Sequence, residues 1–344
     1  MRSLLIFLCL SLAACAPRGT LKYAAPDPRG TVEEIWVANF RPTQPPAEGQ
    51  RSPPRPDALR FRRNDVSVPP THRTGQVEWP KGAPDAATDF VTLRTKEYQN
   101  IGHFARQIAR ADQSGTKETL IFVHGYNVTH GEAVYQLAQV AHDFEIEAPT
   151  VLFSWPSAGA TPGYIYDRDS VLIARDQLEK VIVALTRDPS RQVILMGHSM
   201  GNLLLMETLR QIEISGSLNI ARKIDGLFMV SPDIDGELFY TQAARLDALP
   251  DPTIILAADQ DRALRVSAFL TGRTNRLGSQ TDRSSVRDLP ISVVDVSSVA
   301  NGGLDHSVAL TSPAAIAIIR NLNRKTLPGE AKVPPLVDLA TLGQ

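Results

Sequence analysis

A serine between two glycines is the first feature of the sequence that could do chemistry. Gly197, Ser199 and Gly201 follow the apolar run 193–196 and precede a run typical of a helix that begins at Asn202. Such a tight turn between a strand and a helix needs small neighbours, and it exposes the serine hydroxyl for nucleophilic attack. The next amide, that of Met200, would lie at the helix N-terminus, where an N–H group can stabilise an oxyanion.

A serine nucleophile needs a general base. The chain has seven histidines, and only His306 follows Ser199. In proteins with this type of turn the chain order is serine, acid, histidine. The sequence therefore predicts that His306 is the base.

The base needs an orienting carboxylate. Asp259 and Asp261 follow one predicted strand, and Asp233 and Asp235 follow the strand before it. We favour Asp261, because a turn at Asp-Arg-Ala-Leu would let the carboxylate end the turn with Leu264 packed behind it. The other three aspartates remain open as alternatives.

A loop after an earlier strand, residues 124–127, is the expected second wall of the site. Its sequence is His-Gly-Tyr-Asn, and the N–H of Tyr126 is the predicted second oxyanion donor. We expect His124 to order this loop through hydrogen bonds and not to act as the base.

These residues all follow short apolar strands that alternate with helices. The alternation predicts an α/β fold with a mainly parallel central sheet and helices on both faces. Its carboxyl edge is where a site forms. The predicted strands are 35–40, 65–69, 88–95, 120–123, 151–155, 193–196, 226–230, 253–258 and 291–296, and the predicted helices are 132–144, 170–186, 202–214, 237–246 and 314–322.

Composition excludes several classes of protein. The 344 residues are 43% apolar, which argues against a disordered or a polytopic membrane chain. With 36 Lys+Arg against 37 Asp+Glu, the formal charge of −1 gives no reason to expect nucleic acid as a partner. The two cysteines, Cys9 and Cys15, both lie within the first fifteen residues, so no disulfide can cross-link the rest of the chain. Since neither a phosphate loop nor metal-ligand spacing is present, we expect no cofactor and no metal.

The N-terminus resembles a bacterial signal peptide over residues 1–14. Leu12-Ala13-Ala14-Cys15 resembles a lipobox, in which the cysteine is lipidated and becomes the new N-terminus. The alternative is an ordinary signal peptide with an incidental Cys15. Because Ala16 and not aspartate follows, the expected location is the cell envelope, lipid-anchored at the periplasmic side of the outer membrane.

The rest of the chain divides into three predicted parts. Residues 15–34 are a lipidated N-terminus and tether, 35–322 are one domain that includes a proline-rich loop at 41–59, and 323–344 are a flexible tail.

Several motifs together resemble a known bacterial family. They lie at 66–72, 75–78, 120–127, 153–157, 166–167, 197–201, 261–264 and 305–307. The chain is similar over 35–322 to α/β-hydrolases of the esterase/lipase superfamily whose physiological substrates are largely undefined. The resemblance implies the α/β-hydrolase fold, serine-hydrolase activity and a triad of Ser199, Asp261 and His306.

The expected function is therefore hydrolysis of a small-molecule or lipid carboxylic ester through an acyl-enzyme, including acylated envelope components. A non-catalytic lipoprotein that uses the fold for binding and an acyltransferase with the same triad stay open. Trp155, Tyr164 and Tyr166 either line an acyl pocket or pack under a helix. Six arginines either face anionic groups or form a solvated face: 262, 265, 273, 276, 283 and 287.

Overall fold

The computed structural model describes residues 19–43, 54–259, 261–272, 276–281, 286, 288–299, 306–326 and 336–338. The predicted signal peptide, Cys15 and part of the proline-rich loop, residues 44–53, lie outside the described residues. Within those ranges, no helix combines the length and the apolar character that crossing a bilayer requires.

In the part of the chain that the structure describes, ten strands form one sheet in the order β10-β9-β8-β7-β6-β4-β5-β1-β2-β3. Only the pairs β1–β2 and β2–β3 are antiparallel, so the sheet is mainly parallel, as predicted. The strands are β1 Thr31–Asn39, β2 Arg60–Val68, β3 Val91–Tyr98, β4 Glu118–Val123, β5 Thr150–Ser154, β6 Gln192–His198, β7 Ile224–Val230, β8 Thr253–Ala257, β9 Ile291–Asp295 and β10 Leu336–Asp338.

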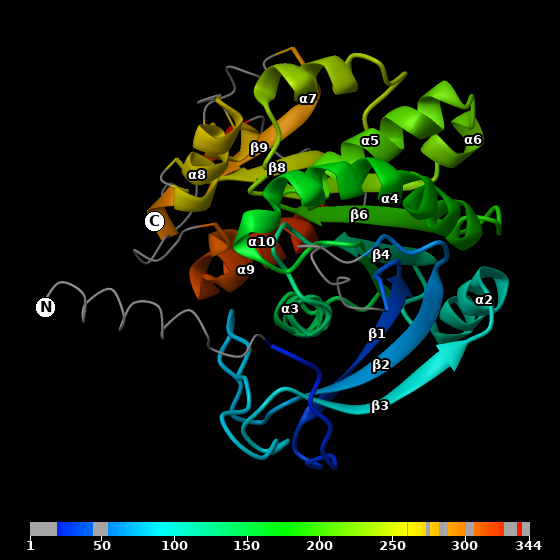
Figure 1. Cartoon of the computed structure of the whole chain (residues 1–344), viewed down its shortest axis with the longest axis vertical. Helices are drawn as coiled ribbons and strands as arrows, with labels where there is room; N and C mark the ends of the chain where they lie inside the picture. The colour runs from blue at the N-terminus through cyan, green and yellow to red at the C-terminus, as the bar shows by residue number, and fades with distance from the viewer. Residues whose placement is uncertain are drawn as a thin grey trace, which may run out of the picture.

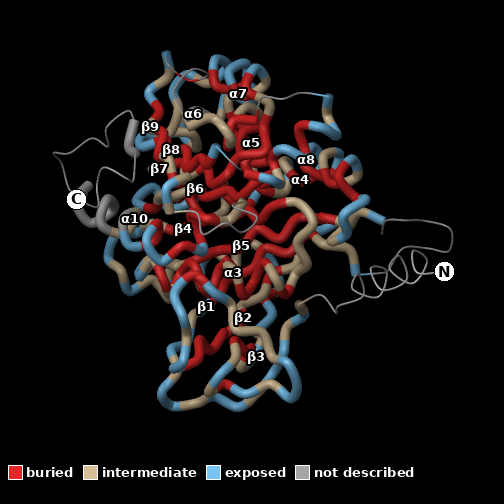
Figure 2. The backbone as a smooth tube through the Cα atoms, turned by 90° about the vertical axis from the view of Figure 1, so that its left-hand side faces the viewer, coloured by how far each residue is buried: buried red, intermediate tan, exposed pale blue. Residues whose placement is uncertain are grey.

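Helices cover both faces of this sheet (Figure 1). They are α2 Ile101–Ala111, α3 His130–Asp143, α4 Tyr164–Leu185, α5 Gly201–Ile214, α6 Leu218–Ala221, α7 Gly236–Ala243, α8 Arg262–Thr271, α9 Val308–Thr311 and α10 Pro313–Thr326, with short 3-10 turns at Thr161–Gly163, Leu277–Ser279 and Ser297–Val299. The apolar residues of α2, α4, α5 and α7 form one core cluster with the sheet, and those of α3, α9 and α10 form a second. Figure 2 shows the buried backbone concentrated along the sheet between these layers.

This architecture is the α/β-hydrolase fold that the sequence predicts. The central strands are buried on both faces, which explains why they read as continuous apolar runs and not as alternating ones. Sequence periodicity did not predict α2, α6, α8, α9 or β10.

The first described residues differ from the predicted free tether over 15–34. Gly19 O accepts a hydrogen bond from Thr129 Oγ1 at 2.9 Å, and Lys22 N donates to the Tyr135 hydroxyl at 2.9 Å. Tyr23 forms a parallel bridge with Thr92. Residues 19–30 therefore lie on the body, because the backbone there finds hydrogen-bond partners that apolar periodicity does not reveal.

The C-terminal part also differs from the predicted flexible tail over 323–344. The last helix, α10, continues to Thr326, and β10 pairs in parallel with β9. The edge of β9 offers unpaired backbone groups with which another segment can pair. A strand of three residues, such as β10, is too short to be recognised from periodicity.

Candidate active site

Ser199 lies at the turn between β6 and α5. Its φ is 53°, in the left-handed region that a residue with a side chain rarely adopts. Both flanking glycines are required by close contacts: a Cβ on Gly197 would lie 2.3 Å from Asn202 Oδ1, and one on Gly201 would lie 2.3 Å from the carbonyl oxygen of Val123. The Ser199 N–H donates to the carbonyl of Val230 at 2.9 Å. The turn is therefore held in its strained shape from several sides.

His306 pairs with Asp261. His306 Nδ1 lies 2.7 Å from Asp261 Oδ2, and the Asp261 side chain is fully buried. The other oxygen, Asp261 Oδ1, accepts the N–H of Leu264 at 3.0 Å, so that Asp261 caps the N-terminus of α8. Of the four candidate acids, Asp261 is the one that the structure brings to His306.

The other three aspartates have different surroundings. Asp259 is exposed. Asp235 caps α7 by accepting the N–H groups of residues 237 and 238. Asp233 is buried, and it accepts hydrogen bonds from the Tyr164 hydroxyl at 3.0 Å and the Ser267 hydroxyl at 2.7 Å. Arg276 Nε lies 3.3 Å from the same carboxylate.

His198 connects the serine turn to His306. Its Nε2 donates to the carbonyl oxygen of His306 at 3.2 Å, and the two rings lie 4.9 Å apart. Burial, and then the neighbouring His306, lower the pKa of His198 to about 3. His198 is therefore neutral. Because it directly precedes Ser199, its contacts with His306 hold the predicted base close to the serine turn.

The predicted oxyanion loop lies directly on the serine. A Cβ on Gly125 would lie 2.9 Å from Ser199 Cβ. His124 Nδ1 donates to the carbonyl of Gly125 at 2.8 Å. Since C=O and N–H point in opposite directions across a trans peptide, this bond turns the N–H of Tyr126 away from His124. Met200, the other predicted donor, precedes the first residue of α5.

Arg41 fixes the tautomer of His124. Its guanidinium donates to His124 Nε2 at 2.9 Å and to the carbonyl of Val128 at 2.7 Å, while its Nε donates to Ser154 Oγ at 2.7 Å. Burial, followed by the charge of Arg41, lowers the pKa of His124 well below its ordinary value. His124 is thus a neutral ring that accepts from Arg41 and donates to Gly125, so that it orders the loop.

Asp167 holds the same loop from the other side. Its carboxylate accepts the N–H of Asn127 at 3.2 Å, the hydroxyl of Ser157 at 2.6 Å and the N–H of Ala158 at 2.6 Å. Burial raises the pKa of Asp167, against the effect of these hydrogen bonds. Sequence reasoning gave no role to Asp167 or Arg41, and the only signal was the presence of Asp167 in a motif quoted for the resemblance.

The aromatic residues near the site mainly pack. Trp155 is fully buried, stacks on the His124 ring at 5.1 Å and donates from Nε1 to the carbonyl of His124 at 2.8 Å. Tyr164 is also buried, and it meets Tyr126 edge to face at 5.3 Å. Tyr166 lies under the guanidinium of Arg55. Trp155 and Tyr164 therefore build the wall of the loop, which is the packing alternative.

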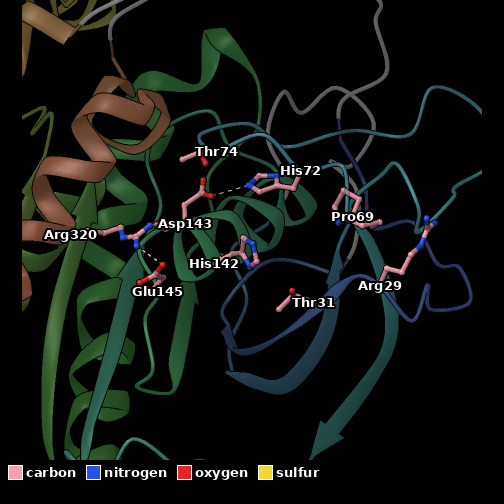
Figure 3. Close-up of a pocket in the computed structure, with 10 residues that line it drawn as sticks. Arg29, Thr31, Pro69, His72, Thr74, His142, Asp143, Glu145 and Arg320 are labelled. Atoms are coloured by element: carbon pink, nitrogen blue, oxygen red, sulfur yellow. Dashed lines mark hydrogen bonds and ion pairs between the residues drawn. The ribbon is translucent and has the colours of Figure 1, made fainter.

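A cavity of about 400 Å³ lies elsewhere, and none of the site residues described above lines it (Figure 3). Figure 3 shows His72 pointing toward Asp143, and the two ring nitrogens of His72 lie 2.9 Å from Glu78 and 2.9 Å from Asp143. Across the described ranges, no group of three His, Cys, Asp or Glu side chains is placed to hold a metal ion.

Residues 102–323 match the family described as "alpha/beta hydrolase of unknown function (DUF900)". None of the curated proteins compared with the chain matches it. Several solved structures do match. A lipase B from Aspergillus fumigatus is 14% identical, with 72% of this chain and 62% of that chain covered and a TM-score of 0.44. A dienelactone hydrolase from Anabaena variabilis is 10% identical, with 77% of this chain and 90% of that chain covered and a TM-score of 0.41, and a thermostable carboxylesterase cloned from a metagenomic library is 11% identical, with 92% of this chain and 94% of that chain covered and a TM-score of 0.39. The chain thus spans less than two thirds of the length of the lipase.

Proposed function

The chain belongs to this family of α/β-hydrolases of unknown function, and from that premise we propose that it cleaves carboxylic esters through an acyl-enzyme on Ser199. The observation that carries the proposal is the 2.7 Å pair between His306 and the buried Asp261. The His306 ring packs at 4.9 Å on His198, the residue that precedes a serine with a left-handed backbone. A binding protein needs neither a strained serine in this turn nor an oriented imidazole at the same edge of the sheet.

The proposed mechanism assigns one role to each group. Ser199 Oγ attacks the ester carbonyl while His306 Nε2 accepts its proton, and Asp261 keeps the other ring nitrogen protonated. The N–H groups of Met200 and Tyr126 stabilise the negative charge on the carbonyl oxygen. The alkoxide leaves with the proton from His306, and a water molecule activated by the same base then hydrolyses the acyl-enzyme.

The substrate class is inferred from the residues that the structure describes next to Ser199. Gly125 and the neutral His198 lie there, and neither carries a charge. We expect uncharged acyl groups, including those of lipids or acylated envelope components.

We also propose that Cys15 carries a lipid that anchors the chain in the bacterial envelope, at the periplasmic side of the outer membrane. The lipobox-like sequence supports this. Cys15 lies four residues before Gly19, which is bonded to Thr129 at the carboxyl edge of the sheet. Intact-mass analysis of the mature protein tests the proposal: an unmodified N-terminus would disprove it.

Turnover of nitrophenyl esters of increasing acyl length tests the activity. Ser199→Ala and His306→Ala should each lower kcat by about 10⁴-fold or more, because nucleophile and base act as a unit. Ser231→Ala is a matched control, since Ser231 is also buried, also has a positive φ of 43° and has a hydroxyl without a hydrogen-bond partner among the described residues. Wild-type protein that hydrolyses none of the esters would favour the binding alternative.

A further inference from the structure

The surface of α8 is unusual for a helix of a water-soluble domain. Three apolar residues face solvent: Phe269 is 85% exposed, Val266 59% and Leu270 53%. The opposite side of the helix is packed, with Leu264 and Ala268 buried. The helix therefore presents an apolar strip that nothing in the described structure covers, and such strips mark interaction surfaces.

The charge of α8 has one sign. Arg262 and Arg265 are exposed, and the ten residues of the helix include no acidic residue. Arg262, Arg265 and Phe269 follow one another at helical spacing, so the cations border the apolar strip. Basic residues beside exposed apolar ones are typical of a helix that lies in the interface of an anionic membrane.

The position of α8 relates it to the proposed active site. The helix begins directly after Asp261, at the carboxyl edge of the sheet, which is also the edge of Ser199. Gly19 is held at this edge through Thr129, the cap of α3. Because four residues reach at most about 14 Å, a lipid on Cys15 would hold a membrane close to this edge.

The first turn of α4 lies beside α8, because Tyr164 and Ser267 both donate to Asp233. Ile165, the next residue, is 65% exposed. It lines a groove of about 300 Å³ with Leu172 and with the charged residues Arg168, Asp169 and Glu207, and no residue of α8 lines this groove. The apolar face is therefore the strip on α8, with Ile165 exposed on the neighbouring helix.

We propose that this face docks onto a bilayer that contains anionic lipids. Val266, Phe269 and Leu270 insert at the level of the headgroups. Arg262 and Arg265 contact lipid phosphates. Docking brings the carboxyl edge of the sheet, and with it Ser199, to the lipid surface. The inference needs no esterase activity, although it would give the proposed hydrolase direct access to lipid esters.

Site-specific fluorescence on the full chain tests the docking. In a Cys9→Ser, Cys15→Ser background, Phe269→Cys is labelled with a polarity-sensitive fluorophore and mixed with phosphatidylcholine vesicles with or without phosphatidylglycerol. The matched control is Ile214→Cys, because Ile214 is 55% exposed at the end of α5. The next helix, α6, lies on the opposite side of the molecule from α8 in Figure 1. Any attachment through the N-terminal segment affects both positions.

We expect a blue shift at position 269, and not at 214, with the anionic vesicles, also when Ser199→Ala is added. Arg262→Gln with Arg265→Gln should lower the partition coefficient about 30-fold, since each basic residue near an anionic surface contributes about 1 kcal/mol. No shift at 269, or equal shifts at 269 and 214, would overturn the proposal. A shift at 269 without vesicles that grows with protein concentration would also overturn it, because a second copy would then cover the face.

Discussion

The carboxylate of Asp261 lies 2.7 Å from His306 Nδ1, although 45 residues separate the two in the chain. The same carboxylate caps α8 through Leu264, so its position is set by the helix and not by the histidine alone. A fully buried carboxylate that is fixed in this way orients the imidazole without competition from water. The pair therefore has the geometry that a general base requires.

Removing the charge of Asp261 should separate this role from simple packing. Asp261→Asn should lower kcat by about 10³- to 10⁴-fold, because the imidazole loses the partner that selects its tautomer. Asp259→Asn, two residues away and exposed, should stay within about tenfold of wild type, since it acts only through screened electrostatics. Steady-state kinetics on folded variants measure both, and an active Asp261→Asn would remove the acid from the proposed triad.

A methyl group on Gly125 should disturb the oxyanion site. Its Cβ would lie 2.9 Å from Ser199 Cβ, so the loop or the serine must move. We expect Gly125→Ala to lower kcat by about 10²-fold, the loss typical of one displaced donor. Gly82→Ala is the control, because no atom lies within 4 Å of its new Cβ. Full activity of a folded Gly125→Ala variant would place the oxyanion site elsewhere.

Arg41 should affect kcat through His124. Arg41→Met removes the donor that pairs with His124 Nε2. The ring is then no longer fixed in the tautomer whose Nδ1–H donates to the Gly125 carbonyl. We expect a fall in kcat of roughly tenfold to 10²-fold with little change in KM, since the effect is on transition-state charge. Arg41→Lys should not restore kcat, because one ammonium group cannot reproduce the several directed bonds of the guanidinium. A loss of thermal stability with unchanged kcat would reduce Arg41 to a structural residue.

His72 should stabilise the fold most at acidic pH. Burial lowers its pKa, but the hydrogen bonds that His72 donates to Asp143 and Glu78 outweigh this and raise the pKa of His72 above the ordinary 6.5. The stabilisation is therefore complete below pH 6.5 and is lost as pH rises through the higher pKa of the folded state.

Urea unfolding of wild type and His72→Gln at several pH values checks this. The difference in unfolding free energy should be largest at about pH 5, where Asp143 is still ionised because its pKa is lowered, and should shrink above neutrality. The control is His103→Gln, because the His103 ring packs against Tyr98 and is not placed between two carboxylates. A difference that is constant with pH would contradict the proposed ion pairs.

How much of the site the sequence predicts depends on how local each contact is. The cap at Asp261 involves Leu264, only three positions away, so the local sequence Asp-Arg-Ala-Leu is enough to predict it. The bonds of Arg41 to His124 and of Asp167 to Asn127 join residues 83 and 40 positions apart, and only the folded sheet brings them together.

The same distinction applies to the fold. The central parallel strands are apolar on both sides, so their positions follow from the sequence alone. The attachment of residues 19–30 depends on hydrogen bonds to distant segments and has no apolar pattern of its own. The pairing of β10 was missed because that strand has only three residues. The start of α4 at Tyr164, six residues earlier than predicted, follows a short turn that contains Pro162.

Mapping of a fluorophosphonate adduct by mass spectrometry tests whether Ser199 is the nucleophile. The probe reacts only with a serine whose hydroxyl is activated by a base, so it reports nucleophile and base together. We predict one adduct per chain, on the peptide that contains Ser199, with labelling lost in His306→Ala and retained in Ser231→Ala. An unlabelled wild-type protein, or an adduct on another serine, would contradict the assignment of Ser199 as the nucleophile.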